Sequence, residues 1–181
     1  MILVYSLKNP RCKSNDFVLD WLYMRILGID PGTGICGFGV IEVDRRKAMA
    51  LVSAGVIATP AHTPMADRLL DIYDSLRQIM RETKPDEVVI EKLFFSQNIT
   101  TGLPVAQARG VMMLVARQEN LPIFEYTPLQ IKQALTGYGR ADKKQMQEMV
   151  RVQLKMKRVP KQDDAADALA AAIMHALTRR V

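Results

Sequence analysis

Five acidic residues stand in sequence contexts where a carboxylate has few ordinary roles. They are Asp30, Glu91, Asp163, Asp164 and Asp167. The first two each end an apolar run, and the other three begin an alanine-rich segment. An unpaired buried carboxylate costs free energy, and several carboxylates together repel one another unless a cation joins them. Ligand sets made only of oxygen select hard cations such as Mg2+ or Mn2+. The pattern therefore predicts a carboxylate-bound metal site for phosphodiester chemistry.

Each of these acids also has a purely structural explanation. The Asp-Pro-Gly sequence at 30–32 is a favoured turn, Glu91 could be a strand end that reaches solvent, and acids in a first helical turn are stabilised by the helix dipole. Asp164 and Asp167, however, are neighbours on one helix surface, and Asp167 borders the apolar stripe. If the strand before Glu91 lies beside the strand before Asp30, both acids emerge at one sheet edge. We favour the metal site, because otherwise three separate explanations must hold together.

The glycine-rich turn after Asp30 leaves a second interpretation open. The segment GTGICGFG could present backbone N–H groups to a nucleotide phosphate. It has no lysine at the spacing of a P-loop, so a Walker motif is excluded. The two histidines, His62 and His175, are assigned no role.

Apolar periodicity predicts the elements that would position these acids. Strands are expected over 25–30, 37–44, 48–58, 88–91 and 123–126, and helices over 65–82, 104–119, 128–135, 142–155 and from about 163 onward. Thr127 is a plausible N-cap, with Pro128 at the first helical position. Three strands close in sequence suggest an antiparallel meander, and later strands separated by helices suggest parallel additions. The prediction is an α/β fold with a mixed five-stranded sheet and helices on both faces.

The bulk properties are those of an ordinary globular protein of one domain. The chain has 181 residues, of which 49% are hydrophobic and 24% charged. Its two cysteines make no disulfide framework, which indicates a reducing cytoplasm, and no apolar run is long enough to span a membrane. Residues 1–23 lack the organised pattern. They are interpreted as an N-terminal extension, either an extended start site or a dispensable appendage, before a domain at 24–181.

Positive charge is concentrated in one part of the chain. The net charge is +6, and residues 126–161 contain nine lysines and arginines against two acidic residues. The basic residues include Lys132, Arg140, Lys143 and Lys144. A basic segment on a nearly neutral body suggests a polyanionic partner, although a solvated helix face would explain the charge equally well.

Five separated motifs resemble one known family. They are ILGIDPGTGICGFGVIE, VVIEKLFFSQN, AQARGV, FEYTPLQIKQALTGYGRADKKQMQEMV and DDAADALAAAI, in this order. The set is similar to RuvC, the bacterial crossover (Holliday) junction endodeoxyribonucleases of the ribonuclease H-like fold. The resemblance covers 24–179 and leaves residues 1–23 outside.

The resemblance implies roles for individual residues. The catalytic and metal-binding carboxylates would be Asp30, Glu91, Asp164 and Asp167, whereas Asp163 stands where the family needs no acid. Some members have histidine where this chain has Asp164, which could alter metal preference.

The remaining implied residues contact DNA. Phe94 matches a base-contacting aromatic of the family. The alternative is that Phe94 is an aromatic residue of the core. Lys132 and Lys143 match functional lysines, with Lys144 an extra neighbour and Arg140 part of the same basic stretch.

The resemblance also implies cofactors and partners. Two Mg2+ ions per site are expected, with Mn2+ as a substitute, together with a homodimer and the RuvA–RuvB branch-migration complex. The enzyme would nick two strands of a four-way DNA junction symmetrically, in recombination and repair. The helix at 104–119 is a candidate dimer interface, because apolar residues surround it; the alternative is a fully buried core helix.

Two other functions would fit part of the pattern. A nucleotide-binding enzyme of the actin-like superfamily would use a similar strand turn, but it needs a second domain that this chain lacks. A non-enzymatic junction-binding protein would keep the basic segment without needing four acids. Cleavage of a labelled junction that depends on Mg2+ would distinguish all three.

Overall fold

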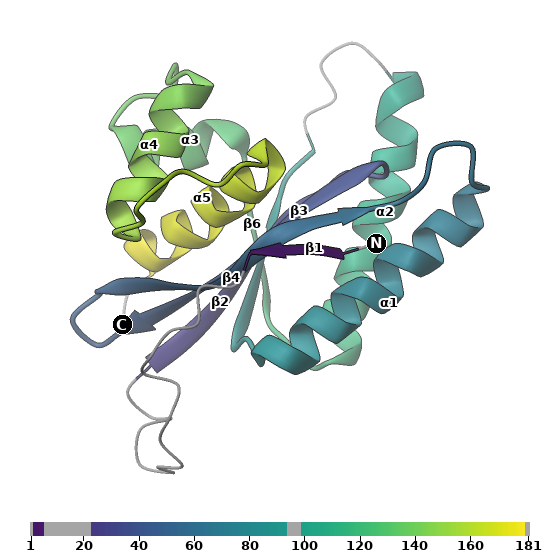
Figure 1. The fold of residues 1–181 in the computed structure, drawn as a ribbon, viewed down its shortest axis with the longest axis horizontal. Helices are drawn as coiled ribbons and strands as arrows, with labels where there is room; N and C mark the ends of the chain where they lie inside the picture. Colours follow the sequence, from purple (N-terminus) through teal and green to yellow (C-terminus); the bar gives the residue numbers. More distant parts are fainter. Residues whose placement is uncertain (1, 6–22, 94–98, 180–181) are drawn as a thin grey trace.

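A computed structural model describes residues 2–5, 23–93 and 99–179, and it shows one mixed sheet between two layers of helices (Figure 1). In chain order the strands are β1 (Ile2–Tyr5), β2 (Tyr23–Asp30), β3 (Ile35–Asp44), β4 (Met49–Ala58), β5 (Glu87–Glu91) and β6 (Ile123–Tyr126). In space the order is β1-β4-β3-β2-β5-β6.

The strand directions are those expected from the spacing of the elements. β2, β3 and β4 form an antiparallel meander, β5 pairs parallel with β2, and β6 pairs parallel with β5. The five predicted strands are thus all present, in the predicted mixed arrangement. A sixth strand, which the sequence did not predict, comes from the N-terminal segment: β1 pairs antiparallel with the outer edge of β4.

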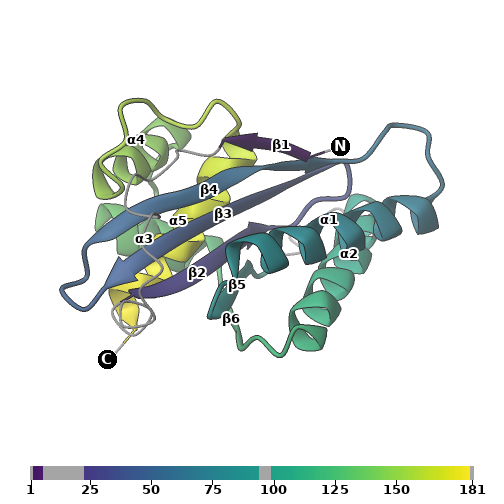
Figure 2. The ribbon, with the colours of Figure 1, turned by 60° about the horizontal axis from the view of Figure 1, so that its bottom comes forward.

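Five helices cover the two faces of the sheet. They are α1 (Met65–Thr83), α2 (Ile99–Gln118), α3 (Pro128–Thr136), α4 (Lys143–Gln153) and α5 (Asp163–Thr178). Helices α1 and α2 lie on one face, and α3, α4 and α5 lie on the other (Figures 1 and 2). In the part of the chain that the structure describes, no helix is both long and apolar enough to cross a membrane.

The starts of the helices test the capping and proline signals that were used to predict them. Thr127 caps α3 through a capping box with Gln130, as predicted, and Asp142 caps α4 in the same way. The predicted start of α2 at Pro104 is wrong, because the helix begins at Ile99 and contains the proline. A proline within a helix removes one N–H donor, and here the helix continues through that loss.

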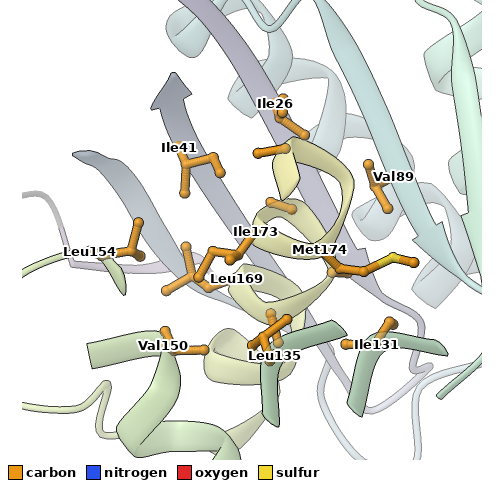
Figure 3. Close-up of a cluster of buried hydrophobic side chains, with 14 of the residues drawn as sticks. Ile26, Ile41, Val89, Ile131, Leu135, Val150, Leu154, Leu169, Ile173 and Met174 are labelled. Atoms are coloured by element: carbon orange, nitrogen blue, oxygen red, sulfur yellow. The ribbon is translucent and has the colours of Figure 1, made fainter. Parts of the chain in front are cut away.

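Two hydrophobic cores, one on each face, hold the layers together. On one face, residues of α1 and α2 such as Leu76 and Met112 pack against the sheet. On the other, α5 lies between the sheet and the α3–α4 pair. In Figure 3, Leu169 and Ile173 of α5 lie among side chains of both neighbouring layers. α5 is therefore buried on two sides, which explains why eleven of its sixteen residues are buried.

Glycines in the strands let α5 lie unusually close to the sheet. A Cβ atom at Gly28 of β2 would collide with the backbone carbonyl of Ala168, and one at Gly37 of β3 would collide with that of Asp164. Alanines dominate the facing surface of the helix. Small residues on both sides therefore fix how near the start of α5 comes to the end of β2 and the start of β3.

A buried polar network fixes the opposite end of α5. The His175 ring binds Glu87 of β5 through Nε2 at 2.7 Å and the Tyr126 hydroxyl of β6 through Nδ1 at 2.7 Å. Arg179 pairs with the second oxygen of Glu87 at 2.8 Å. His175 and Glu87 are both buried, so each polar atom needs such a partner. The histidine that the sequence left without a role thus anchors the helix to the two parallel strands.

Candidate functional site

Asp30 and Glu91 end two neighbouring parallel strands at the same edge of the sheet. The register pairs Ile29 of β2 with Ile90 of β5, so each acid directly follows a paired residue. Side chains alternate along a strand, and both isoleucines pack in the core under α1 and α2. The two acids therefore face the other side, which α5 covers.

The first turns of α5 bring two more acids to this edge. Gly37 of β3 is paired with Asp30, and the main chain of Asp164 packs directly against that glycine. The start of α5 therefore lies over the end of β2. Asp167 comes one turn later, and its charge acts on both Asp30 and Glu91. The structure thus brings together the four carboxylates that the family resemblance implied.

Burial and mutual repulsion make ionisation of these acids unfavourable. Burial, together with the negative charges of Glu91, Asp167 and Asp164, raises the pKa of the Asp30 carboxyl to about 8. Burial and then the charge of Asp167 raise the pKa of Glu91 to about 7. Burial likewise raises the pKa of Asp167, with Asp164 adding to the effect. Such perturbed groups in one place mark a candidate functional site.

The donor set fits a hard divalent cation. All four groups are carboxylates, and a bound cation offsets the repulsion that raises their pKa values. Among the described residues, however, no three histidine, cysteine or acidic side chains are placed so that they could hold a metal ion without moving. The site is therefore a group of mutually repelling carboxylates with the chemistry of a metal site.

Two lysines lie near enough to the carboxylates to affect their ionisation. The positive charge of Lys132 on α3 lowers the pKa of Glu91 and Asp167, opposing the effect of burial. The charge of Lys143, at the start of α4, does the same for Asp30 and Asp167. Both lysines come from the predicted basic segment, so the fold brings that segment to the edge of the acidic site.

Lys143 is held by the acid that the family pattern does not require. Its Nζ lies 2.9 Å from Oδ2 of Asp163, and the Gln147 amide donates to Oδ1 of the same carboxylate at 2.6 Å. These bonds connect the first residue of α5 to two consecutive turns of α4. The pKa of the Asp163 carboxyl is lowered, chiefly by its bond to Lys143. Asp163 therefore behaves as a partner of the basic helix.

For the other described residues expected to bind DNA, the structure shows no contact with the carboxylates. Lys144 on α4 and Arg140 in the preceding loop are exposed. Phe94 lies outside the described residues.

One residue near this site was given no role from the sequence. Arg109 of α2 forms an ion pair with Glu125 of β6 and donates through Nε to the backbone carbonyl of Glu91 at 3.4 Å. The sequence signal was present, because Arg109 belongs to the AQARGV motif and Glu125 to the FEYTP motif. Neither motif showed by itself that the two residues meet beside Glu91.

Comparisons of the sequence with known proteins agree with one another. A family model described as "Crossover junction endodeoxyribonuclease RuvC" matches residues 26–175. The chain is 54% identical over 153 residues to the crossover junction endodeoxyribonuclease RuvC of Desulfitobacterium hafniense, covering 84% of this chain and 92% of that protein. It is 52% identical over 155 residues to the protein of the same name from Chloroflexus aggregans, covering 86% and 94%.

The three-dimensional comparison gives the same result. The fold matches a solved structure of Thermus thermophilus RuvC in complex with a Holliday junction substrate with a TM-score of 0.81. The two sequences are 33% identical, and the match covers 85% of this chain and 93% of the other.

Proposed function

The chain belongs to the RuvC family of crossover junction endodeoxyribonucleases, and we propose that it resolves four-way DNA junctions by paired, symmetric, metal-dependent nicks. The observation that carries this proposal is the meeting of Asp30 and Glu91, on adjacent strand ends, with Asp164 and Asp167 at the start of α5. A bound cation would offset the mutual repulsion of these carboxylates, and it could act on a phosphodiester.

We propose that these four carboxylates hold two Mg2+ ions, with Mn2+ able to replace them. When bound, such ions activate a water nucleophile and neutralise charge at the leaving oxygen. The chain itself supplies the fixed oxygen donors, on two strand ends and one closely packed helix. Because α5 is anchored at both ends, its two acids keep their position relative to the sheet, which favours rapid chemistry.

We further propose that the basic segment binds the DNA backbone beside the acids. Lys132 and Lys143 are the strongest candidates, because their charges already act on the carboxylates. Lys144 and Arg140 would extend this surface, and Phe94 would contact a base, as the family resemblance implies. Phosphate contacts of this kind give affinity and register but carry no sequence information.

The experiment that tests the function uses a labelled four-way junction and a linear duplex of the same sequence. We expect paired nicks in the junction with Mg2+, none with EDTA, and little cutting of the duplex. Binding without cutting at any Mg2+ or Mn2+ concentration would instead indicate a junction-binding protein that is not an enzyme. Nucleotide binding without junction binding would favour the actin-like alternative.

Removing one lysine should change the salt dependence of binding. Lys143→Ala should weaken junction binding and reduce the slope of log K against log salt by about one unit, because each neutralised phosphate contributes about 0.9. The measurement is a series of affinities in EDTA between low and moderate salt. Arg46→Ala is the matched control, because Arg46 is exposed at the β3–β4 turn, at the opposite end of the sheet. Unchanged slopes for Lys132, Lys143 and Lys144 variants alike would contradict this DNA-binding surface.

We propose that the working unit is a two-fold homodimer that uses the exposed face of α2. Met112 and Val115 of α2 are buried against the sheet, whereas Leu103 and Leu114 are 60% and 52% exposed. These leucines are eleven residues apart, which is close to three helical turns, so they share one face. The helix therefore has one apolar side in the core and another available to a second copy, and closed two-fold dimers are the commonest assemblies.

A dimer with one inactive subunit should make only one of the two nicks. A heterodimer of wild type and Asp30→Asn should nick one strand and rarely complete resolution, because each nick needs its own set of carboxylates. The measurement is the ratio of nicked to resolved product from a cruciform plasmid. Leu114→Arg should weaken dimerisation in sedimentation experiments, whereas Leu70→Arg on α1, a site of 58% exposure, should not. A monomer that makes paired cuts would refute the dimer.

The family resemblance further suggests a place of action. We propose that the enzyme works in the cytoplasm with the RuvA–RuvB branch-migration complex, whose action would deliver four-way junctions to it.

We propose that residues 24–181 form the nuclease domain. β1 pairs only with the outer edge of β4, and the residues that match the family model, 26–175, begin after this segment. A chain that starts at Met24 should therefore fold and cleave like the full chain, as measured by its melting temperature and nicking rate. Insoluble protein, or a nicking rate reduced several-fold, would show that the N-terminal segment is required.

A further inference from the structure

We propose that Arg109, paired with Glu125, is a positioning residue that fixes the main chain of Glu91 and thereby the direction of its carboxylate. The inference rests on the proposed role of Glu91 in metal-dependent cleavage. It assigns a purpose to two motifs, AQARGV and FEYTP, that the acidic site and the basic segment leave unexplained.

The strand register explains why Arg109 and Glu125 meet. Glu125 of β6 is paired with Ile90 of β5, and Tyr126 is paired with Glu91. Paired residues of neighbouring strands point to the same face of the sheet. Ile90 packs in the core beneath α2, so Glu125 must also face α2, while Glu91 faces the side of α5. A carboxylate that points toward an apolar helix needs a cation, and Arg109 of that helix supplies it.

The guanidinium of Arg109 contacts two strands at once. One terminal nitrogen, Nη2, pairs with Oε1 of Glu125 on β6, while Nε points to the carbonyl oxygen of Glu91 on β5. The side chain of Arg109 is 19% exposed and that of Glu125 is 33% exposed, so the pair is partly shielded from water. A planar guanidinium can serve two acceptors in fixed directions, which a lysine ammonium on a flexible stem cannot do in the same way.

The peptide that links Glu91 to Lys92 is thereby held at both of its polar ends. Its carbonyl accepts from Arg109 at 3.4 Å, and its N–H donates to the carbonyl of Tyr126 at 2.8 Å. β5 ends at Glu91, so sheet pairing alone supports this peptide from one side. Holding the second end restricts rotation of the peptide plane, which sets the direction in which the Glu91 side chain leaves the strand.

A positioning role for Arg109 differs from a stabilising role in the size of its effects on reaction rate and on folding stability. A partly exposed ion pair contributes little to overall stability. A displacement of about 1 Å at a reacting group, in contrast, can reduce a rate about 100-fold. The expected signature of Arg109 is therefore a large effect on turnover and on metal binding, with little effect on folding.

The test compares two arginine substitutions on α2 with one substitution of the partner carboxylate on β6. Arg109→Lys keeps the charge and can pair with Glu125, but it loses the second bond to the Glu91 carbonyl. We expect its kcat to fall about 10- to 100-fold, with junction KM and melting temperature near wild type. Its affinity for Mn2+, measured by calorimetry without DNA, should also fall. Glu125→Gln should have a milder effect, because an amide oxygen still accepts from Arg109. Arg117→Lys, an exposed arginine in the last turn of α2, is the matched control.

The outcomes distinguish this inference from the function on which it rests. If wild type does not cut junctions, the proposed function fails and the inference with it. If Asp30→Asn is inactive but Arg109→Lys keeps the wild-type kcat and Mn2+ affinity, the positioning role is wrong and the proposed function stands. A change confined to KM would make Arg109 a DNA contact, and a loss of activity that follows a loss of folded protein would make it structural. Either result overturns the inference.

Discussion

Replacing Asp30 by asparagine is expected to abolish nicking while leaving junction binding intact or tighter. The substitution keeps the size of the side chain but removes the charge that lies among Glu91, Asp164 and Asp167. Loss of that carboxylate removes one of the proposed metal ligands, and less negative charge then faces the DNA phosphates. The measurements are the nicking rate of a labelled junction in Mg2+ and the affinity for the same junction in EDTA.

Asp163→Asn is the matched control for this experiment. Asp163 lies in the first turn of the same helix as Asp164, but its carboxylate is bound to Lys143 and Gln147. It should therefore retain turnover, and any change should appear in junction affinity, because Asp163 holds Lys143. Near wild-type cutting by Asp30→Asn or Glu91→Gln would show that the site is wrongly assigned, and equal losses in Asp163→Asn would show that any charge change here is harmful.

The Asp30→Asn variant should be more stable than wild type when no metal is bound. In the folded chain Asp30 keeps its proton up to about pH 8, whereas in the unfolded chain it ionises near its ordinary value of 3.8. Its contribution to stability is therefore present below that lower value and is lost as the pH rises through about 8. In EDTA, Asp30→Asn should melt above wild type at alkaline pH, and the difference should shrink toward pH 4. Added Mg2+ should stabilise wild type more than the variant, since a ligand of the folded state raises stability.

Replacing Gly28 by alanine is expected to damage both the fold and the active site, although it adds a single methyl group. The new Cβ would collide with the backbone carbonyl of Ala168, which cannot rotate away as a side chain would. Overpacking of this kind costs about 1–3 kcal/mol, occasionally more. Relief requires α5 to move away from β2, which carries Asp164 and Asp167 away from Asp30. We therefore expect a lower free energy of unfolding, and a nicking rate reduced at least about 100-fold for a shift near 1 Å.

Gly110→Ala is the control for the stability measurement. Gly110 lies within α2, where an added Cβ meets no atom within 4 Å. There alanine should raise the free energy of unfolding by about 0.5–1 kcal/mol, because glycine is a poor helix former. If Gly28→Ala unfolds and cuts like wild type, the close approach of α5 does not position the site.

Much of this protein could be predicted from local features of the sequence. The apolar runs before Asp30 and Glu91 identified two buried strands, and the capping signals at Thr127 and the proline after it placed the start of α3. These predictions succeeded because strand burial and helix capping depend on residues within a few positions. The N-terminal strand β1 was missed, because an edge strand is defined by its distant partner, β4.

Local patterns identified the residue types of the candidate site: carboxylates at the ends of two strands and at the start of a helix, and a basic segment to accompany them. Their arrangement depends on contacts that form only when the chain is folded. Contacts between Gly28 and Ala168, between Arg109 and Glu125, and between His175 and Glu87 join residues that lie far apart in the chain. No local pattern encodes such pairs, because each depends on strand register and on how closely a helix packs against the sheet.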